Sequence, residues 1–334
     1  MSAPNEDFQP PPPPTTQEKP PKPRPTKLLF VGIGLIVVGV IVLLGGIVKF
    51  IPGGISTGIV IALSGIILLA LSFVPLPVIP ETEQPLSLLE KVAGVFYEPS
   101  RVFRNLRAHP NWLGAFLIIC VLTAIYSFSF VQRITPERIV DHTTQKMAEM
   151  GPPFAPPPDR LEAIRTEQLQ SLKNPVERIG AVVKSFVGIL VVTCIVAGLS
   201  LLGILAFGGR MNFWQALAVT FYAALPVVII QKLLGLAILY LKAPEDLHPI
   251  LNQETTLQDN LGILLSPANH PVLFVMASFI GLTSFYGLWL RAKGLHMGGT
   301  RVGKNAGWGV AIMLWVLFLV LATIFTALFP GFIG

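Results

Sequence analysis

A single lysine inside a long apolar stretch has the clearest potential for chemistry. Lys232 follows Gln231 within residues 213–241, which carry no other charge. An ammonium group at mid-bilayer costs on the order of 3 kcal/mol on insertion scales, so such a lysine normally has a polar partner or a wet cavity. Gln231 and Lys232 are therefore a candidate intramembrane polar site for an anion or a lipid headgroup. The alternative, which the segment length favours, is that the span ends near Ile230 and Lys232 extends to the outer interface.

Three arginines form a second candidate site, for lipid headgroups. Arg101, Arg104 and Arg107 are three residues apart and follow Pro99, so they form one stripe of a short helix. The other side of this helix is apolar: Val102, Phe103 and Leu106. The pattern is typical of an interfacial helix, with arginines at lipid phosphates and apolar groups in the headgroup boundary. The alternative, which we favour and which is compatible with the first, is flanking positive charge without a specific ligand.

The remaining reactive residue types are scattered. The five histidines, at positions 109, 142, 248, 270 and 296, include no pair three or four residues apart, and no His-Glu-x-x-His motif occurs. The sequence also lacks a Gly-x-x-x-x-Gly-Lys-Ser/Thr phosphate loop and a Gly-x-Ser-x-Gly nucleophile turn. No predicted span contains an acidic residue, which argues against an intramembrane aspartyl protease. We therefore expect no enzymatic activity, no metal and no cofactor.

The composition indicates that lipid surrounds most of the chain. Of 334 residues, 52% are hydrophobic and 13% are charged, and the mean hydropathy is +0.68. Soluble domains carry about 25% charged residues. The two cysteines, Cys120 and Cys194, both lie in apolar stretches, so we expect no disulfide framework. The sequence predicts an all-α, polytopic membrane protein that does not bind nucleic acid.

We expect about seven transmembrane helices. A hairpin over residues 28–76 contains two of them, 28–50 and 55–75, joined by a Pro-Gly-Gly turn. The glycines of its first helix would allow close helix contact: Gly32, Gly34, Gly39, Gly45 and Gly46. An amphipathic linker over 77–111 follows, broken at Pro99. The five-helix domain, 112–334, contains spans at 112–131, 179–207, 213–241, 271–290 and 306–329, with loops at 132–180 and 242–270.

Positive charge predicts the orientation. Thirteen Lys and Arg residues lie in the tail and in the connections on its side, against only Lys49 and Lys242 in the short connections on the other side. The N-terminus is therefore predicted to be cytoplasmic and the C-terminus outside, as are the loops 132–180 and 242–270. Residues 1–27 form a proline-rich tail that we expect to be disordered. Its composition favours a solvated spacer, the alternative being a site for a proline-reading partner.

Three stretches in order carry a family resemblance. The first runs from Val95-Phe96-Tyr97-Glu98-Pro99 to His109-Pro110-Asn111-Trp112, and the second is residues 207–217, Phe-Gly-Gly-Arg-Met-Asn-Phe-Trp-Gln-Ala-Leu. The third comprises Phe285-Tyr286-Gly287-Leu288-Trp289, Gly294-Leu295 and Gly303-Lys304-Asn305-Ala306. Residues from about 93 to 330 thus resemble the Yip domain family, membrane proteins named for interacting with Ypt/Rab-type GTPases. The resemblance implies five spans, as counted above, and leaves out the tail and the hairpin.

Two functional hypotheses follow. The first is a non-enzymatic membrane-organising or adaptor protein of Yip type, whose partners are the bilayer, anionic lipid at the cytoplasmic face and a protein that binds the tail. The alternative is a transporter or lipid-handling protein with an anion or headgroup site near Lys232.

Overall fold

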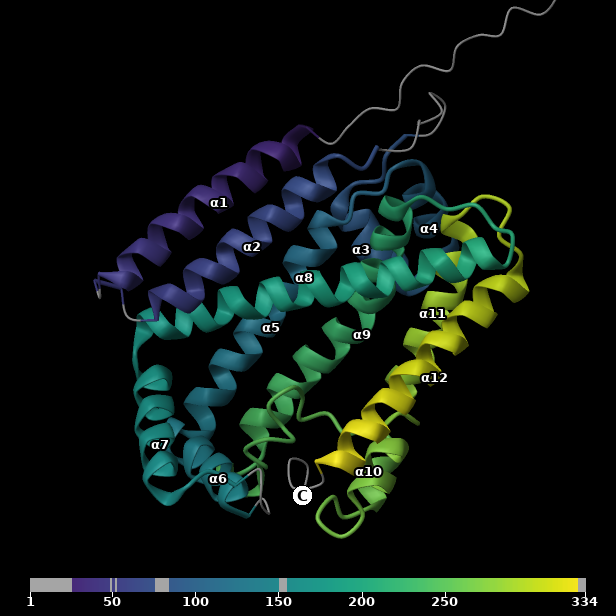
Figure 1. Ribbon diagram of the computed structural model, residues 1–334. Coiled ribbons are helices and arrows are strands. Elements are labelled where there is room, and N and C mark those ends of the chain that lie inside the picture. The colour runs from purple at the N-terminus through teal and green to yellow at the C-terminus, as the bar shows by residue number, and fades with distance from the viewer. Residues whose placement is uncertain (1–25, 49, 52, 76–83, 150–154, 330–334) are drawn as a thin grey trace, which may run out of the picture.

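The computed structural model describes residues 26–48, 50–51, 53–75, 84–149 and 155–329 (Figure 1). Apart from the first two residues of α1, the proline-rich tail lies outside them. The described residues form an all-α fold, as predicted. The helices are α1 Thr26–Ile47, α2 Gly54–Ser72, α3 Leu88–Tyr97, α4 Pro99–Ala108, α5 Leu113–Ile134, α6 Pro136–Glu149, α7 Pro158–Lys173, α8 Pro175–Ala206, α9 Phe213–Leu241, α10 Pro271–Ser278, α11 Leu282–Gly298 and α12 Lys304–Leu328, with two short 3₁₀ turns at Pro244–Asp246 and Leu261–Leu264.

Glycines bring α1 and α2 into backbone contact. A Cβ atom on Gly39 would lie 2.4 Å from the amide nitrogen of Ala62, and one on Gly46 would lie 2.3 Å from that of Ile55. Gly32 is similarly close to α2, whereas a Cβ on Gly34 would meet nothing within 4 Å. The predicted close contact is therefore confirmed for the glycines spaced seven apart, because this spacing keeps them on one helix face.

The centre of the molecule is the first half of α9. Its side chains from Trp214 to Ala223 are buried, and α5, α8 and α11 surround the helix. The ring of Trp112 stacks on those of Trp214 and Phe221, with centroids 6.4 and 5.7 Å apart. These aromatic contacts hold the start of α5 against the first half of α9.

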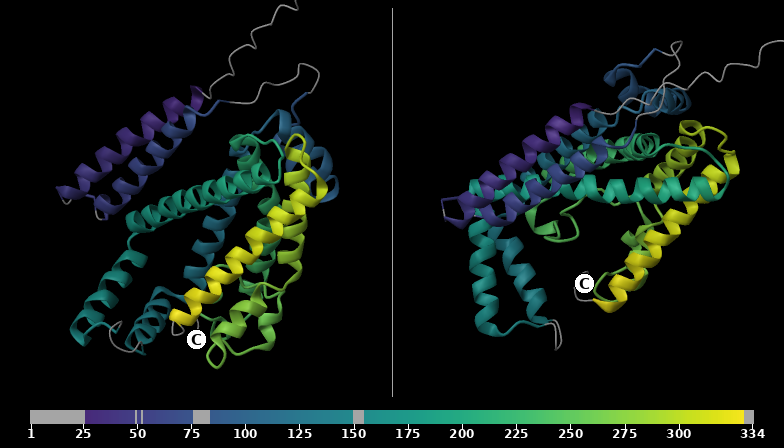
Figure 2. Two further views of the ribbon diagram at one scale, coloured as in Figure 1. Left: turned by 45° about the vertical axis from the view of Figure 1, so that its right-hand side comes forward. Right: turned by 45° about the horizontal axis from the view of Figure 1, so that its top comes forward.

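Several connections gather at two opposite ends of the bundle, the end with α4 and the end with α6, whereas the turn between α1 and α2 lies beside the start of α8 (Figure 2). The α4 end contains α3, α4 and two turns, at residues 207–212 and 299–303. Backbone hydrogen bonds of 2.7 and 2.8 Å between Arg210 and Thr300 join the two turns. At the α6 end, Arg133 and Arg138 donate to carbonyls of residues 242–247. The two loops predicted to share the outer side therefore pack together. Which end is cytoplasmic stays a prediction.

Six described helices are long and apolar enough to cross a membrane: Leu28–Ile47 within α1, then α2, α5, α8, α9 and α12. The predicted span at 271–290 is instead divided into α10 and α11. Backbone pairing of Asn260 with Gly281 separates them, and a Cβ on Gly281 would lie 2.8 Å from that of Asn260. The loop that contains Asn260 packs at this break, and the apolar pattern of residues 271–290 does not reveal it. The predicted total of seven spans is therefore not confirmed.

Candidate functional site

The helices α3 and α4 are fixed to the bundle through their apolar sides. Ser87 and Glu90 form a capping box at the start of α3, and Pro99 occupies the first turn of α4. Phe103 and Leu106 are fully buried, and Phe103 lies against Gly294 of α11, where a Cβ would be 3.0 Å from its ring. The prediction that the apolar side of α4 enters the headgroup boundary is therefore wrong, since the glycines of α11 open a space inside the protein for it.

The outward sides of these helices carry apolar and basic groups together. Leu89 and Tyr97 are 81% and 73% exposed, and Phe96 is 39% exposed. Arg101 and Arg104 are also exposed. We call these five residues the α3–α4 platform.

Charged side chains of α3 and α4 interact with each other. The pKa of Glu90 is lowered chiefly by its hydrogen bonds with Ser87 and further by the charge of Arg101. Arg101 also lies 3.5 Å from the Glu98 carboxylate. Arg107, the third predicted headgroup contact, is half-buried, and its carbonyl accepts a hydrogen bond of 2.7 Å from Gln215. Headgroup contact by the three arginines stays a prediction, and Arg101 and Arg104 have the exposure it requires.

Lys232 lies inside the protein rather than at the end of a helix. The helix α9 continues without a break to Leu241, so whether the membrane span itself ends near Ile230 stays a prediction. The side chain of Lys232 is buried and donates to the carbonyl of Glu254. Its Nζ lies 3.6 Å from the Glu254 carboxylate and 4.7 Å from the centroid of the Tyr126 ring. A carbonyl, a carboxylate and an aromatic face thus surround the ammonium group.

The second half of α9 is held to the loop at 252–259 by further hydrogen bonds. Thr256 Oγ1 donates to the carbonyl of Gly235 at 2.5 Å, and Tyr126 Oη donates to that of Asn252 at 2.7 Å. Gln231 Nε2 donates to Thr283 Oγ1 of α11 at 3.1 Å. Gln231 and Lys232 therefore have partners within the chain. Binding of an anion or headgroup at this site stays a prediction.

Comparison with known protein families assigns the chain to a family. A model of the Yip1 domain matches residues 93–325, well over half of the chain. The chain belongs to the Yip1 domain family. No curated protein and no solved structure matches it. The Yip1 domain begins within α3 and includes most of the platform and the Lys232 network, whereas the α1–α2 hairpin precedes it.

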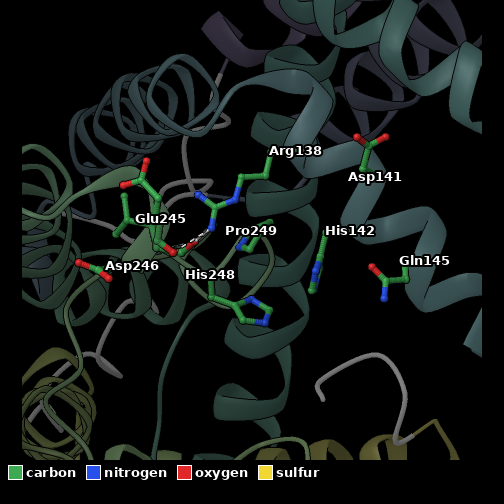
Figure 3. A pocket seen from close by; sticks show the side chains of 9 residues that line it. Arg138, Asp141, His142, Gln145, Glu245, Asp246, His248 and Pro249 are labelled. Carbon is green, nitrogen blue, oxygen red and sulfur yellow. Dashed lines mark hydrogen bonds between the residues drawn. The ribbon is translucent and has the colours of Figure 1, made fainter.

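The Yip1 domain also brings together two histidines that their separation in the sequence concealed. A cavity of about 500 Å³ at the α6 end is lined by α6 and by the segment 245–249 (Figure 3). The rings of His142 and His248 meet there edge to face, with centroids 4.9 Å apart. His248 Nδ1 accepts the amide hydrogens of Ile250 and Leu251. In the part of the chain that the structure describes, His142 Nε2 is buried without a hydrogen-bond partner, and no group of three or more His, Cys, Asp or Glu residues could hold a metal.

Acid is expected to open the contact between α6 and residues 244–252. Burial lowers the pKa of His142, and burial together with His142, Lys146 and Arg138 lowers the pKa of His248 from 6.5 to about 4. The open state regains the ordinary value and takes up protons first, so the contact is fully stable above about pH 6.5 and weakens as the pH falls toward about 4. Each proton taken up changes the opening equilibrium by up to about tenfold per pH unit. The other charged groups near the two histidines are Arg138, Asp141, Lys146, Glu149, Glu245 and Asp246, of which Glu149 acts in the opposite direction and raises the pKa of His142.

Hydrogen exchange at several pH values, corrected for intrinsic rates, would measure this opening. The double variant His142→Gln, His248→Asn should remove the pH dependence of the opening, because neither new side chain titrates. Asn at position 248 can still accept the two amide hydrogens, so the contact itself is kept. His270→Gln, at an exposed histidine, is the control. Equal pH dependence in the wild type, the double variant and the His270→Gln control would show that other groups control the contact.

Proposed function

We propose that this Yip1-domain protein is a non-enzymatic membrane-organising protein that gathers anionic lipids at its α3–α4 platform. The observation that carries the proposal is that two exposed arginines lie with exposed Leu89 and Tyr97 on helices that are packed into the bundle through fully buried side chains, Val95, Phe103 and Leu106. Aromatic and apolar side chains at this level enter the headgroup region, while arginines contact phosphates. The α4 end is also the end predicted to be cytoplasmic, where anionic lipids are concentrated.

Fixed charges distinguish the platform from a solvated basic tail. Each Lys or Arg near an anionic surface contributes about 1 kcal/mol of attraction. Because Phe103 and Leu106 are buried in the bundle, the backbone of α4 that carries Arg101 and Arg104 stays in place when a lipid leaves. The platform would therefore hold anionic lipids at a constant place beside the spans. An adaptor role, with a protein bound to the tail or to the platform, is the other form of this hypothesis.

Replacing Arg101 and Arg104 by glutamine together is expected to lower the preference for anionic over zwitterionic lipid by about thirtyfold, because two charges worth about 1 kcal/mol each are lost. The preference can be measured in reconstituted vesicles with spin-labelled phosphatidylserine and phosphatidylcholine. The matched control is Arg160→Gln with Lys242→Gln, which removes two exposed charges from the α6 end. If the platform variant retained the full preference, or if both variants lost it equally, lipid gathering by the platform would be wrong.

A further inference from the structure

A groove opens between the second half of α5 and the first part of α8, beside the end of α7. Its volume is about 430 Å³, and its walls are mostly apolar, including Ala124, Phe128, Val182 and Phe186. Both helices are candidate membrane spans. Because the bilayer solvates such spans, the apolar walls adjoin acyl chains rather than water.

One cation lies in the lining of this groove. The guanidinium carbon of Arg178 is 4.3 Å from the centroid of the Phe128 ring, which is a cation–π contact, and the group carries five N–H donors. Within the described residues, no carboxylate lies at ion-pair distance from Arg178. The neighbouring Glu177 is directed toward the hairpin, since its Cγ would be 3.4 Å from a Cβ on Gly53. Among the residues that the structure describes, the side-chain N–H donors of Arg178 therefore have no hydrogen-bond acceptor.

The dimensions fit one lipid chain. Along α8, Arg178 and Phe186 are eight residues apart, which is about 12 Å at 1.5 Å per residue. One leaflet of the hydrocarbon core is about 15 Å deep. Arg178 lies in the first turn of α8, beyond its most apolar part, and the groove extends from it toward the middle of the helix.

We propose that this groove binds one phospholipid, with its phosphate at Arg178 and one acyl chain along α5 and α8. The guanidinium fork matches two phosphate oxygens, and the cation–π contact with Phe128 holds it at the groove before the lipid arrives. The site is separate from the α3–α4 platform, so it does not depend on the function proposed above.

Native mass spectrometry of the full chain released from detergent tests this site by counting retained lipids. The wild type should retain one phospholipid per chain. Arg178→Gln should lower its occupancy about tenfold, Arg178→Lys should lower it less, and Ala124→Trp should abolish it by filling the groove. The controls are Arg160→Gln for charge and Leu117→Trp for bulk, because Leu117 is 48% exposed on α5 and does not line the groove.

The arginine variants keep the test valid if Ala124→Trp does not fold. Equal occupancy in the wild type and in Arg178→Gln would overturn the proposal, as would retention of a fatty acid or of detergent alone in place of a phospholipid. Loss in Ala124→Trp with no change in Arg178→Gln would place a chain in the groove without the phosphate contact, and this too would contradict the assignment.

Discussion

Leucine in place of Gly39 is expected to separate α1 from α2. A Cβ at this position would lie 2.4 Å from the amide nitrogen of Ala62 and 2.8 Å from the carbonyl oxygen of Gly58, and neither backbone atom can move without moving α2. Overpacking of this kind costs about 3 kcal/mol. Hydrogen exchange in α1 and α2 should therefore become about a hundredfold faster.

Gly34→Leu is the matched control for this change. It adds the same side chain to the same helix, but a Cβ at Gly34 meets nothing within 4 Å. Both variants raise helix propensity equally, so a difference between them reports the helix–helix contact alone. If both variants exchanged at the same rate, the hairpin would not depend on backbone contact at Gly39.

Alanine in place of Phe103 is expected to destabilise the Yip1 domain by about 3–5 kcal/mol. The side chain is fully buried between α4 and the glycines of α11, and its removal leaves a cavity at the base of the platform. For a domain of this size, the loss corresponds to a fall of about 10 °C in the unfolding temperature. Thermal aggregation in detergent, followed by size-exclusion chromatography, measures it.

Tyr97→Ala provides the comparison from the same region. Tyr97 is 73% exposed on α3, so its loss should leave the unfolding temperature within about 2 °C of the wild type, since surface changes are usually small. The two variants should also differ in lipid preference, which Tyr97→Ala alters without unfolding α4. Equal unfolding temperatures would contradict the buried position of Phe103.

The sequence was sufficient for features that depend on local pattern. Apolar stretches without charges predicted the long helices, and Pro99 predicted the boundary between α3 and α4. The stripe of Arg101 and Arg104 correctly indicated an amphipathic helix. Its apolar side was assigned to lipid rather than to protein because the space that receives Phe103 is created by Gly294, almost two hundred residues away.

Long-range contacts determined what the sequence could not reveal. Lys232 is covered by the carbonyl and carboxylate of Glu254, which follow α9 in a loop with no recognisable pattern. His142 and His248 come from separate connections, so their spacing gave no signal. The break between α10 and α11 likewise depends on pairing of Gly281 with Asn260. Each is a contact between segments that only the folded chain brings together.

The depth of a spin label at residue 97 tests most directly whether the platform lies in the headgroup layer. The label would be attached through Tyr97→Cys after replacing Cys120 and Cys194 by alanine, in vesicles that contain anionic lipid. We predict that it is more accessible to oxygen and less accessible to a water-soluble nickel reagent than a label attached through Arg160→Cys. Equal accessibility of the two labels to nickel would place the platform in water and contradict the proposed function.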